Sequence, residues 1–325
     1  MNYVVFDLEW NQCPFGKERE NDKLPFEIVE IGAVKVGSQG ERLGEFQRIV
    51  RPVVYKKLHF RTKEVIHIDA KTLEGGQPFY VAVKEFLEWC GEDCMFCTWG
   101  TTDLVELQRN MKYYGLLKML PGPIRFYDVQ KLFSLAYEDG KSRKSLEYAS
   151  SFLQLEQQRD FHRALSDAWY TAEIFRGMFD KYVLQYYSID CYQNPKTKEE
   201  QVYAVFDNYA KLISREFDSK EEAMKDREIS AARCFLCEKN VRKKVKWFSL
   251  SPKNHCCLAY CGKHGYLKGK IRMKRTDEGK FYVVKTMKLI DEAEAEEIRS
   301  RREELKKRRR EKRRQAKKTP GATER

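Results

Sequence analysis

The sequence predicts an α/β fold with a mixed five-stranded sheet flanked by helices, followed by a small β-rich module and a charged helical or disordered tail. Three strand-like runs come first, and helix-like and strand-like runs then alternate up to a long closing helix. After residue 230 the composition changes to Cys, His, Gly and Lys, with short strand-like runs. We therefore expect a first domain over residues 1–185, a helical connector over 186–230, a β-rich module over 231–288 and a basic tail over 289–325.

The first strand is expected over residues 3–10, because aromatic and β-branched residues open the chain. Residues 28–36 and 44–50 are the next two strands, separated by a turn rich in Gly and Ser. A helix over 80–90 and a short buried strand over 94–99 follow.

Apolar residues recur at helical spacing after Asp103, and Gly115 stands where a cap would lie, so a helix is expected between them. Residues 125–129 are the fifth strand. A helix over 145–153 has Ser145 as its N-cap candidate. The closing helix should run from about Ala164 to Tyr182.

The positive charge of the chain is concentrated near its end. Of the formal net charge of +13, residues 301–325 carry +9, from 13 Lys or Arg and 4 Asp or Glu. Such a tail is typical of proteins that bind nucleic acid or another polyanion, and the alternative is a solvated, solubilising tail.

No apolar run is long enough for a transmembrane helix, and the first residues do not resemble a signal peptide, so we expect a cytoplasmic protein without membrane contact. The ten cysteines are then expected to be reduced thiols or metal ligands. Cys90, Cys94 and Cys97 are interpreted as packing thiols.

Two carboxylates interrupt the first strand in "FDLEW". Asp7 and Glu9 are two residues apart, so they share one face, where they repel each other unless divalent cations lie between them. An exposed strand end or ion pairs would be the plainer explanation. Three further residues make a metal site a better explanation than ion pairs: Asp103 at a helix start, and His162 with Asp167 in "FHRALSDAW". We expect His162 in the loop before the closing helix and Asp167 one turn inside it.

The segments "FDLEW", "TWGTTDLVELQRN" and "HRALSDA" resemble the three motifs of the DEDDh 3′–5′ exonucleases, which have a ribonuclease H-like fold. The resemblance covers about residues 1–182. The "WGTTD" form of the second motif is most similar to the KapD-like branch, which is related to exoribonucleases. Trp10 departs from the family, where Thr is common.

The resemblance implies a metal-dependent hydrolase that releases nucleoside 5′-monophosphates from the 3′ end of single-stranded nucleic acid, with RNA favoured. Two Mg²⁺ or Mn²⁺ ions would be held by Asp7, Glu9, Asp103 and Asp167. His162 would act as general base.

The same resemblance suggests where substrate would bind and which functions compete. Expected substrate contacts are Trp10, Leu8, Asn11 and Trp99; Trp10 either stacks on a base or packs in the core. Alternative functions are a DNA exonuclease or proofreading-type subunit, and a regulatory nucleic-acid-binding protein.

A second metal site is indicated by "CFLC" and "YCGKHG". Cys234, Cys237, Cys261 and His264 form two close pairs of ligands, as in a structural Zn²⁺ site, with Gly262 and Gly265 allowing the second turn. His255, Cys256 or Cys257 could replace one of these ligands. Basic residues interleaved with aromatic residues surround the cluster, so the module and tail are expected to hold nucleic acid or contact a ribonucleoprotein. A purely structural zinc ribbon is the alternative.

Overall fold

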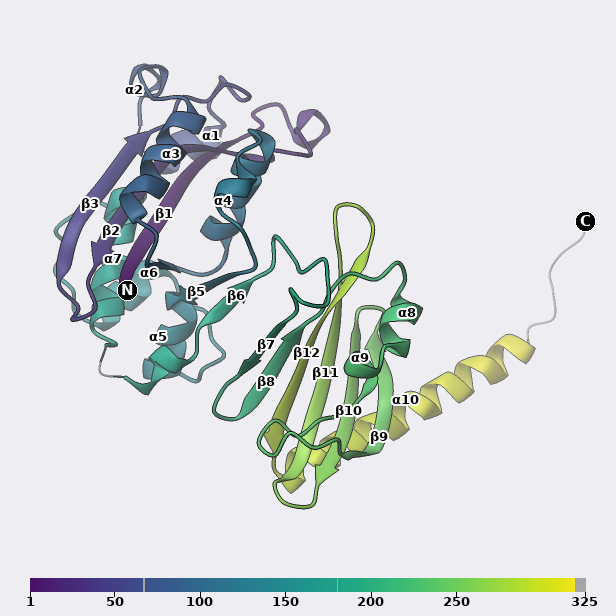
Figure 1. Ribbon diagram of the computed structural model, residues 1–325. Helices are drawn as coiled ribbons and strands as arrows, with labels where there is room; N and C mark the ends of the chain where they lie inside the picture. Colours follow the sequence, from purple (N-terminus) through teal and green to yellow (C-terminus); the bar gives the residue numbers. More distant parts are fainter. Residues whose placement is uncertain (67, 180, 319–325) are drawn as a thin grey trace, which may run out of the picture. The chain divides into compact units, whose positions relative to one another are not determined.

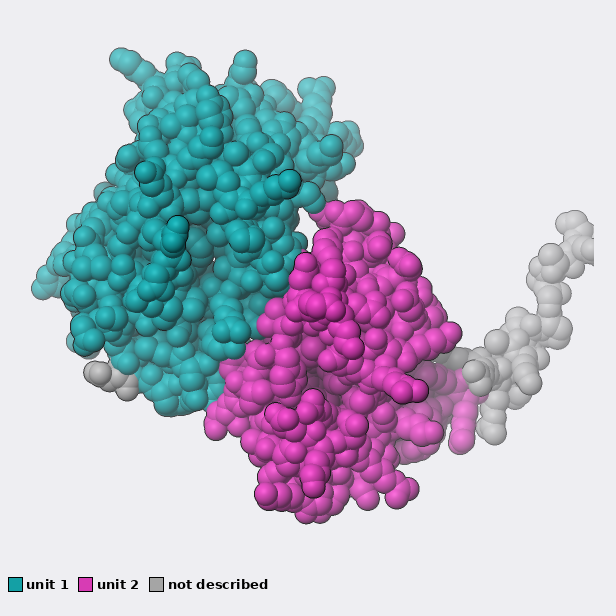
Figure 2. Space-filling view, in the orientation of Figure 1, with its two compact units in different colours: residues 1–193 teal, residues 194–325 magenta. Residues whose placement is uncertain are grey.

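The structure is a computed structural model that describes residues 1–66, 68–179 and 181–318 (Figure 1). The chain divides into two compact units, residues 1–193 and residues 194–325 (Figure 2). Each has its own six-stranded sheet.

The first unit contains all five predicted strands and one more. They are β1 (Asn2–Gln12), β2 (Phe26–Val36), β3 (Arg42–Ile49), β4 (Cys94–Thr98), β5 (Ile124–Asp128) and β6 (Ser188–Asp190). Their order is β3-β2-β1-β4-β5-β6. β1 pairs parallel with β4, and β4 with β5, while the other pairs are antiparallel. The predicted mixed sheet is confirmed, and β6 extends it by one edge strand.

Helices cover both faces of this sheet (Figure 1). They are α1 (Phe60–Val65), α2 (Ala70–Glu74), α3 (Phe79–Cys90), α4 (Thr102–Tyr113), α5 (Val129–Tyr137), α6 (Leu146–Phe152) and α7 (Ala164–Arg176). Short 3₁₀ turns are η1 (Lys17–Arg19), η2 (Leu117–Met119) and η3 (Tyr182–Gln185). The predicted Ser145 cap is confirmed, since its hydroxyl accepts from the Tyr148 N–H. α7 ends six residues earlier than predicted, because Gly177, a poor helix former, follows Arg176.

The alternation along β1 separates two cores. Phe6 and its neighbours two residues away pack against α3 and α4. Val5 packs on the other side with α5, α6 and α7. Asp7 and Glu9 continue the Val5 face, so they project toward the side that α7 covers.

The second unit is built on the order β7-β8-β12-β11-β10-β9. The strands are β7 (Val202–Val205), β8 (Tyr209–Ile213), β9 (Arg242–Ser251), β10 (Asn254–Cys261), β11 (Gly265–Arg275) and β12 (Phe281–Ile290). Residues 186–230 therefore differ from the expected helical connector. They hold β6, which belongs to the first sheet, and β7 and β8, which belong to the second, besides the short helices α8 (Lys220–Lys225) and α9 (Arg227–Ser230).

Different helices cover the two faces of the second sheet. Ala223 of α8 and Ile229 of α9 pack on Ile271 and Met273. On the opposite face, Ala295 and its neighbours in α10 (Glu292–Lys318) pack on β9 and β10. The charged segment is thus helical up to residue 318, and residues 319–325 of the predicted tail lie outside the described residues. Among the described residues, no helix is both long and apolar enough to cross a bilayer.

Candidate active site and zinc site

Asp7 and Glu9 lie where β1 extends past its parallel neighbour. The pairing of β1 with β4 ends at Val5 and Cys97, so the next residues of β1 lie past the end of this pairing. Carboxyl ends of parallel strands are the usual place for a binding site in an α/β sheet. Strand geometry thus places both carboxylates at this end of the sheet.

Gly32 brings the third carboxylate to the same place. Gly32 is directly opposite Asp7 in the pairing of β1 with β2. A Cβ at this position would lie 2.0 Å from the backbone nitrogen of Leu165, so only glycine lets the first turn of α7 approach the strand this closely. Asp167 lies in that turn, and carboxylate oxygens of Asp7, Glu9 and Asp167 lie within 4.8 Å of one another.

Asp103 approaches from the other neighbouring strand. It is the second residue of α4, just after β4, and is buried. The backbone N–H groups of Asp103 itself and of Leu8 donate to its carboxylate. Asp103 is also the charged group that most strongly raises the pKa of Asp7. Asp7 therefore has Asp103 as a charged neighbour in addition to Glu9 and Asp167.

The pKa values of all four carboxyl groups in this cluster are raised. Burial, followed by the neighbouring carboxylates, raises the pKa of Asp7 well above its usual range. Burial first, and then Asp167, raises the pKa of Glu9 to about 8. Burial raises the pKa of Asp103 and of Asp167 to about 7. Four oxygen-bearing groups that resist joint ionisation suit hard divalent cations such as Mg²⁺ or Mn²⁺, which offset the repulsion.

A buried ion pair fixes the start of α7. Glu30, opposite Glu9 in the sheet, is fully buried and accepts 3.0 Å hydrogen bonds from Nε and Nη2 of Arg163. Arg163 precedes the first residue of α7 and also lowers the pKa of Glu9. Sequence reasoning missed this pair. An acid within the apolar run "EIVEIGAVKV" was a usable signal for Glu30, whereas its partner is 133 residues away.

His162 lies in the loop before α7, as expected, with φ of 66°. Left-handed φ values are uncommon outside glycine. Its backbone N–H donates to Asp167 at 3.2 Å, which ties the loop to the first turn of the helix. The imidazole is about half exposed, and its Nε2 is 4.0 Å from Oε1 of Glu147 in α6, a neighbour that sequence reasoning missed.

The four predicted substrate contacts occupy different environments. Leu8 is 3% exposed and packs in the core, and Asn11 is fully buried, with its amide bonded to Tyr55, Lys57 and His59 backbone groups. Both side chains are therefore buried, and a substrate contact by either residue stays a prediction. Trp10 is partly buried against Phe26, and Trp99 donates its indole N–H to the Lys144 carbonyl.

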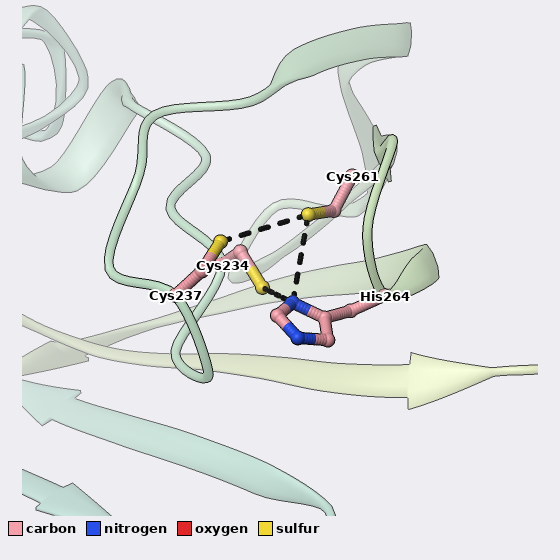
Figure 3. Close-up of side chains that lie close together, drawn as sticks. All are labelled: Cys234, Cys237, Cys261 and His264. Atoms are coloured by element: carbon pink, nitrogen blue, oxygen red, sulfur yellow. Dashed lines mark hydrogen bonds between the residues drawn. The ribbon is translucent and has the colours of Figure 1, made fainter.

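The second cluster brings together Cys234, Cys237, Cys261 and His264 (Figure 3). Sγ of Cys237 and Sγ of Cys261 are 3.7 Å apart, and Nδ1 of His264 lies 3.4 Å from Sγ of Cys234 and 3.7 Å from Sγ of Cys261. A tetrahedral Zn²⁺ site has S···S edges of about 3.8 Å and S···N edges of about 3.5 Å, given its bond lengths. The four side chains thus have the spacing of a closed zinc site.

Both ligand pairs have the same backbone arrangement. Sγ of Cys234 accepts from the N–H groups two and three residues later, and so does Sγ of Cys261. At Cys261 the donors are the N–H groups of Lys263 and His264. The Lys263 N–H has the largest effect on the pKa of Cys261, which is lowered to about 6, and this favours the thiolate that binds metal. Each pair is followed by a residue with positive φ, Glu238 or Gly265. Gly265 has the positive φ expected of the predicted turn. Gly262 has no positive φ, and a Cβ added there would lie in open space.

The alternative zinc ligands His255, Cys256 and Cys257 lie outside the group of four. Cys256 and Cys257 are adjacent in β10 and point to opposite faces of the sheet. Cys256 packs with Ala295 of α10, and Cys257 lies under Gly269. Burial raises the pKa of Cys257 to about 12, which disfavours a thiolate. His255 is not part of the group of four either.

Comparisons with known proteins agree with the motif resemblance. The exonuclease family RNase_T matches residues 4–175, which is more than half of the chain. No curated protein matches the chain.

Similar solved structures include three nucleases. The nuclease domain of 3′hExo, a DEDDh family member, bound to rAMP, has 19% identity and a TM-score of 0.49, covering 58% of this chain and 96% of that one. A 3′-exonuclease that recognises the 3′ end of a histone mRNA stem-loop has 18% identity and a TM-score of 0.47, covering 56% and 83%. Cell-death related nuclease 4 has 17% identity and a TM-score of 0.46, covering 55% of this chain and 64%, or just under two thirds, of that one.

Proposed function

We propose a function from the premise that this chain belongs to the RNase_T family of exonucleases, which matches residues 4–175. Family membership confirms the expected exonuclease domain and makes the protein a hydrolase. The observation that carries the proposal further is the convergence of Asp7, Glu9, Asp103 and Asp167 at one end of the sheet. We infer a metal-dependent 3′–5′ exonuclease that uses these four carboxylates. Membership of the KapD-like branch stays a prediction.

The carboxylates would hold two divalent cations. Asp7, Glu9 and Asp167, whose carboxylate oxygens lie within 4.8 Å of one another, would hold one ion, and Asp103 with Asp7 would hold the other. When bound, such ions lower the pKa of the attacking water and stabilise the charge on the phosphate. The Arg163–Glu30 pair and Gly32 hold α7, and with it Asp167, in place. These residues therefore maintain the spacing of the acidic cluster.

His162 is proposed as the general base. It precedes α7 in a loop that its own N–H attaches to Asp167, while its half-exposed ring can accept a proton from a water at the rim of the cluster. Oε1 of Glu147 in α6 lies 4.0 Å from Nε2 of this ring. The proposed base is thus placed by the loop before α7 and lies beside α6.

Single-stranded RNA is the substrate that we favour. Trp10 and Trp99 are each partly exposed, and we propose that these two aromatic side chains contact the substrate. The solved 3′-exonucleases to which this chain is similar include one described with a histone mRNA stem-loop and one with rAMP. The alternatives are DNA 3′ ends, and a regulatory protein that binds nucleic acid without cutting it. The zinc site is proposed to hold the second unit together, and the basic tail to contact nucleic acid or a ribonucleoprotein, with a cytoplasmic location.

The proposal is tested with matched RNA and DNA single strands labelled at the 5′ end, incubated with Mg²⁺, Mn²⁺ or chelator. We expect a ladder that shortens from the 3′ end, nucleoside 5′-monophosphates as products, faster loss of RNA and no reaction with chelator. Faster loss of DNA would favour the DNA exonuclease. Binding without any cleavage, in the presence of metal, would favour the regulatory protein.

A further inference from the structure

The sheet of the second unit has an unusual charge composition. Its six strands, all within the described residues, contain twelve Lys or Arg residues and no Asp or Glu. β11 alone, with the sequence "GYLKGKIRMKR", contributes five of the twelve. Both signs of charge are usually mixed on a protein surface. An acid-free sheet therefore points to a partner that supplies the negative charge.

The strand register places four of these cations together. Lys270, Arg272 and Lys274 alternate along β11 with Ile271 and Met273, which are buried on the opposite face. Lys288 of β12 is directly opposite Lys268, so it lies on the same face as the three cations. All four side chains are exposed. We call Lys270, Arg272, Lys274 and Lys288 the basic face.

Helix α10 covers only the neighbouring part of this side of the sheet. Its Ala295 and Ile298 pack on Leu258 of β10 and the residues around it. Lys268, at the border, forms an ion pair with Glu294 of α10, with 3.5 Å between Nζ and Oε1. The covered part of the surface thus has an acidic partner from the chain, and the basic face begins where α10 no longer lies over β11.

Binding of an anion would relieve the mutual repulsion of these exposed cations. Diagonal neighbours on adjacent strands are about 7–8 Å apart, within reach of long side chains. The side chains along β11 repeat every two residues, or about 6.8 Å, in a straight row. A straight row of cations matches an extended chain of phosphates better than it matches a compact acidic ligand.

We propose that the basic face binds the phosphodiester backbone of the single-stranded nucleic acid whose 3′ end the first unit hydrolyses. This inference rests on the proposed function, because it takes the substrate of the first unit as the ligand of the second. Backbone contacts carry no base or sugar preference, so RNA and DNA bind to this face alike. The face raises the affinity for long strands and does not take part in the chemistry.

The test compares two fourfold variants in full-length, zinc-loaded protein that also carries Asp7→Asn to prevent hydrolysis. The first has Lys270→Gln, Arg272→Gln, Lys274→Gln and Lys288→Gln. The matched control has Lys198→Gln, Lys225→Gln, Lys239→Gln and Lys253→Gln, which removes the same charge from exposed positions outside the face. Binding of labelled RNA and DNA of about 30 nucleotides, several times a typical single-strand site, is measured from about 50 to 200 mM salt.

We expect the basic-face variant to bind both strands at least tenfold more weakly than the control variant. The slope of log K against log salt should fall by about 3, since each lost phosphate contact on a single strand contributes about 0.7. Equal affinity and slope in the two variants would overturn the proposal, as would a loss confined to one kind of sugar. Zinc content and melting temperature verify that both variants are folded.

A charge-retaining variant and a separate assay complete the design. A variant with Lys270→Arg, Lys274→Arg and Lys288→Arg retains all four positive charges, so it should bind nucleic acid as tightly as the control variant. Weak binding like that of the glutamine variant would also contradict the proposal. Hydrolysis of a strand of about four nucleotides by the wild-type protein, too short to need a second site, tests the proposed function independently. A protein that binds long strands through the face but cuts none would refute the exonuclease and leave the basic face in place.

Discussion

The two sheets of this protein have opposite charge compositions. The strands of the first contain seven Asp or Glu and four Lys or Arg, whereas the strands of the second contain twelve Lys or Arg and no acid. In the first sheet, Glu27 accepts from three backbone N–H groups, and Glu30 from Arg163. Asp7 and Glu9 are instead surrounded by other carboxylates. The comparison teaches that uncompensated charge marks the proposed ligand: metal cations at the first sheet and phosphates at the second.

The largest expected effect is on catalysis. Asp7→Asn keeps the shape of the side chain but removes the charge shared by the whole cluster. Activity on a single strand should fall by far more than the roughly 10–100-fold loss typical of residues that only support a metal ligand. Steady-state hydrolysis measures it, with melting temperature as the folding control. A variant that retains wild-type activity would contradict the assignment of the first sheet.

The second expected effect is the loss of structure around the proposed zinc site. Cys234→Ser removes one of four proposed ligands from a cluster that joins the loop before β9 to the turn between β10 and β11. Since zinc binding contributes roughly 10–16 kcal/mol in small zinc modules, we expect loss of zinc and proteolysis within the second unit. Metal analysis should give one zinc per wild-type chain.

Cys256→Ser is the matched control for this experiment, because Cys256 is buried against α10 away from the cluster. It should retain zinc. Normal zinc content in the Cys234→Ser variant, or equal loss in both, would show that the ligand set is different.

A smaller effect is expected from the packing of α7. In Gly32→Ala, the new methyl group would lie 2.0 Å from a backbone atom of Leu165, so α7 must move and take Asp167 with it. Overpacking of this kind costs about 1–3 kcal/mol of unfolding free energy. Activity should fall more than stability alone explains, as measured by hydrolysis well below the melting temperature.

Gly44→Ala, in β3 of the same sheet, is the control for this substitution, since no atom outside the adjacent residues lies within 4 Å of the position that its methyl group would take. It should leave both the hydrolytic activity and the free energy of unfolding nearly unchanged. If Gly32→Ala behaved like Gly44→Ala, the close approach of α7 would not be needed to place Asp167.

The smallest effect is a pH dependence of stability. The raised pKa values of Glu9, about 8, and of Asp103 and Asp167, about 7, mean that the folded state holds these protons more tightly than the unfolded state. This contribution is present at low pH and is lost as the pH rises through 7 and 8. Mn²⁺, which binds the ionised carboxylates, should therefore raise the melting temperature more at pH 8 than at pH 6. An equal shift at both values would contradict the assignment of these raised pKa values to the metal site.

Local patterns predicted much of the first unit and little of the segment after it. The strands around Asp7 and the helices that carry Asp103 and Asp167 have clear periodicity, so these elements could be located from the sequence. The resemblance to the DEDDh exonucleases then implied that their acidic residues form one site. β6 and β7 are short edge strands with half-exposed residues, and no apolar run distinguishes them from a connector. Burial of Leu8 and Asn11 was missed because it depends on α3, α4 and the loop around Tyr55, which are distant in sequence.

The most direct test of the central claim is the amount of Mn²⁺ bound by the zinc-loaded protein, measured by equilibrium dialysis. Asp128→Asn is the matched control, because Asp128 is also a buried acid at a strand end but caps α5 instead. We predict that wild-type protein and Asp128→Asn bind two Mn²⁺ per chain and that Asp7→Asn loses this binding. Equal Mn²⁺ binding by all three proteins would contradict the account.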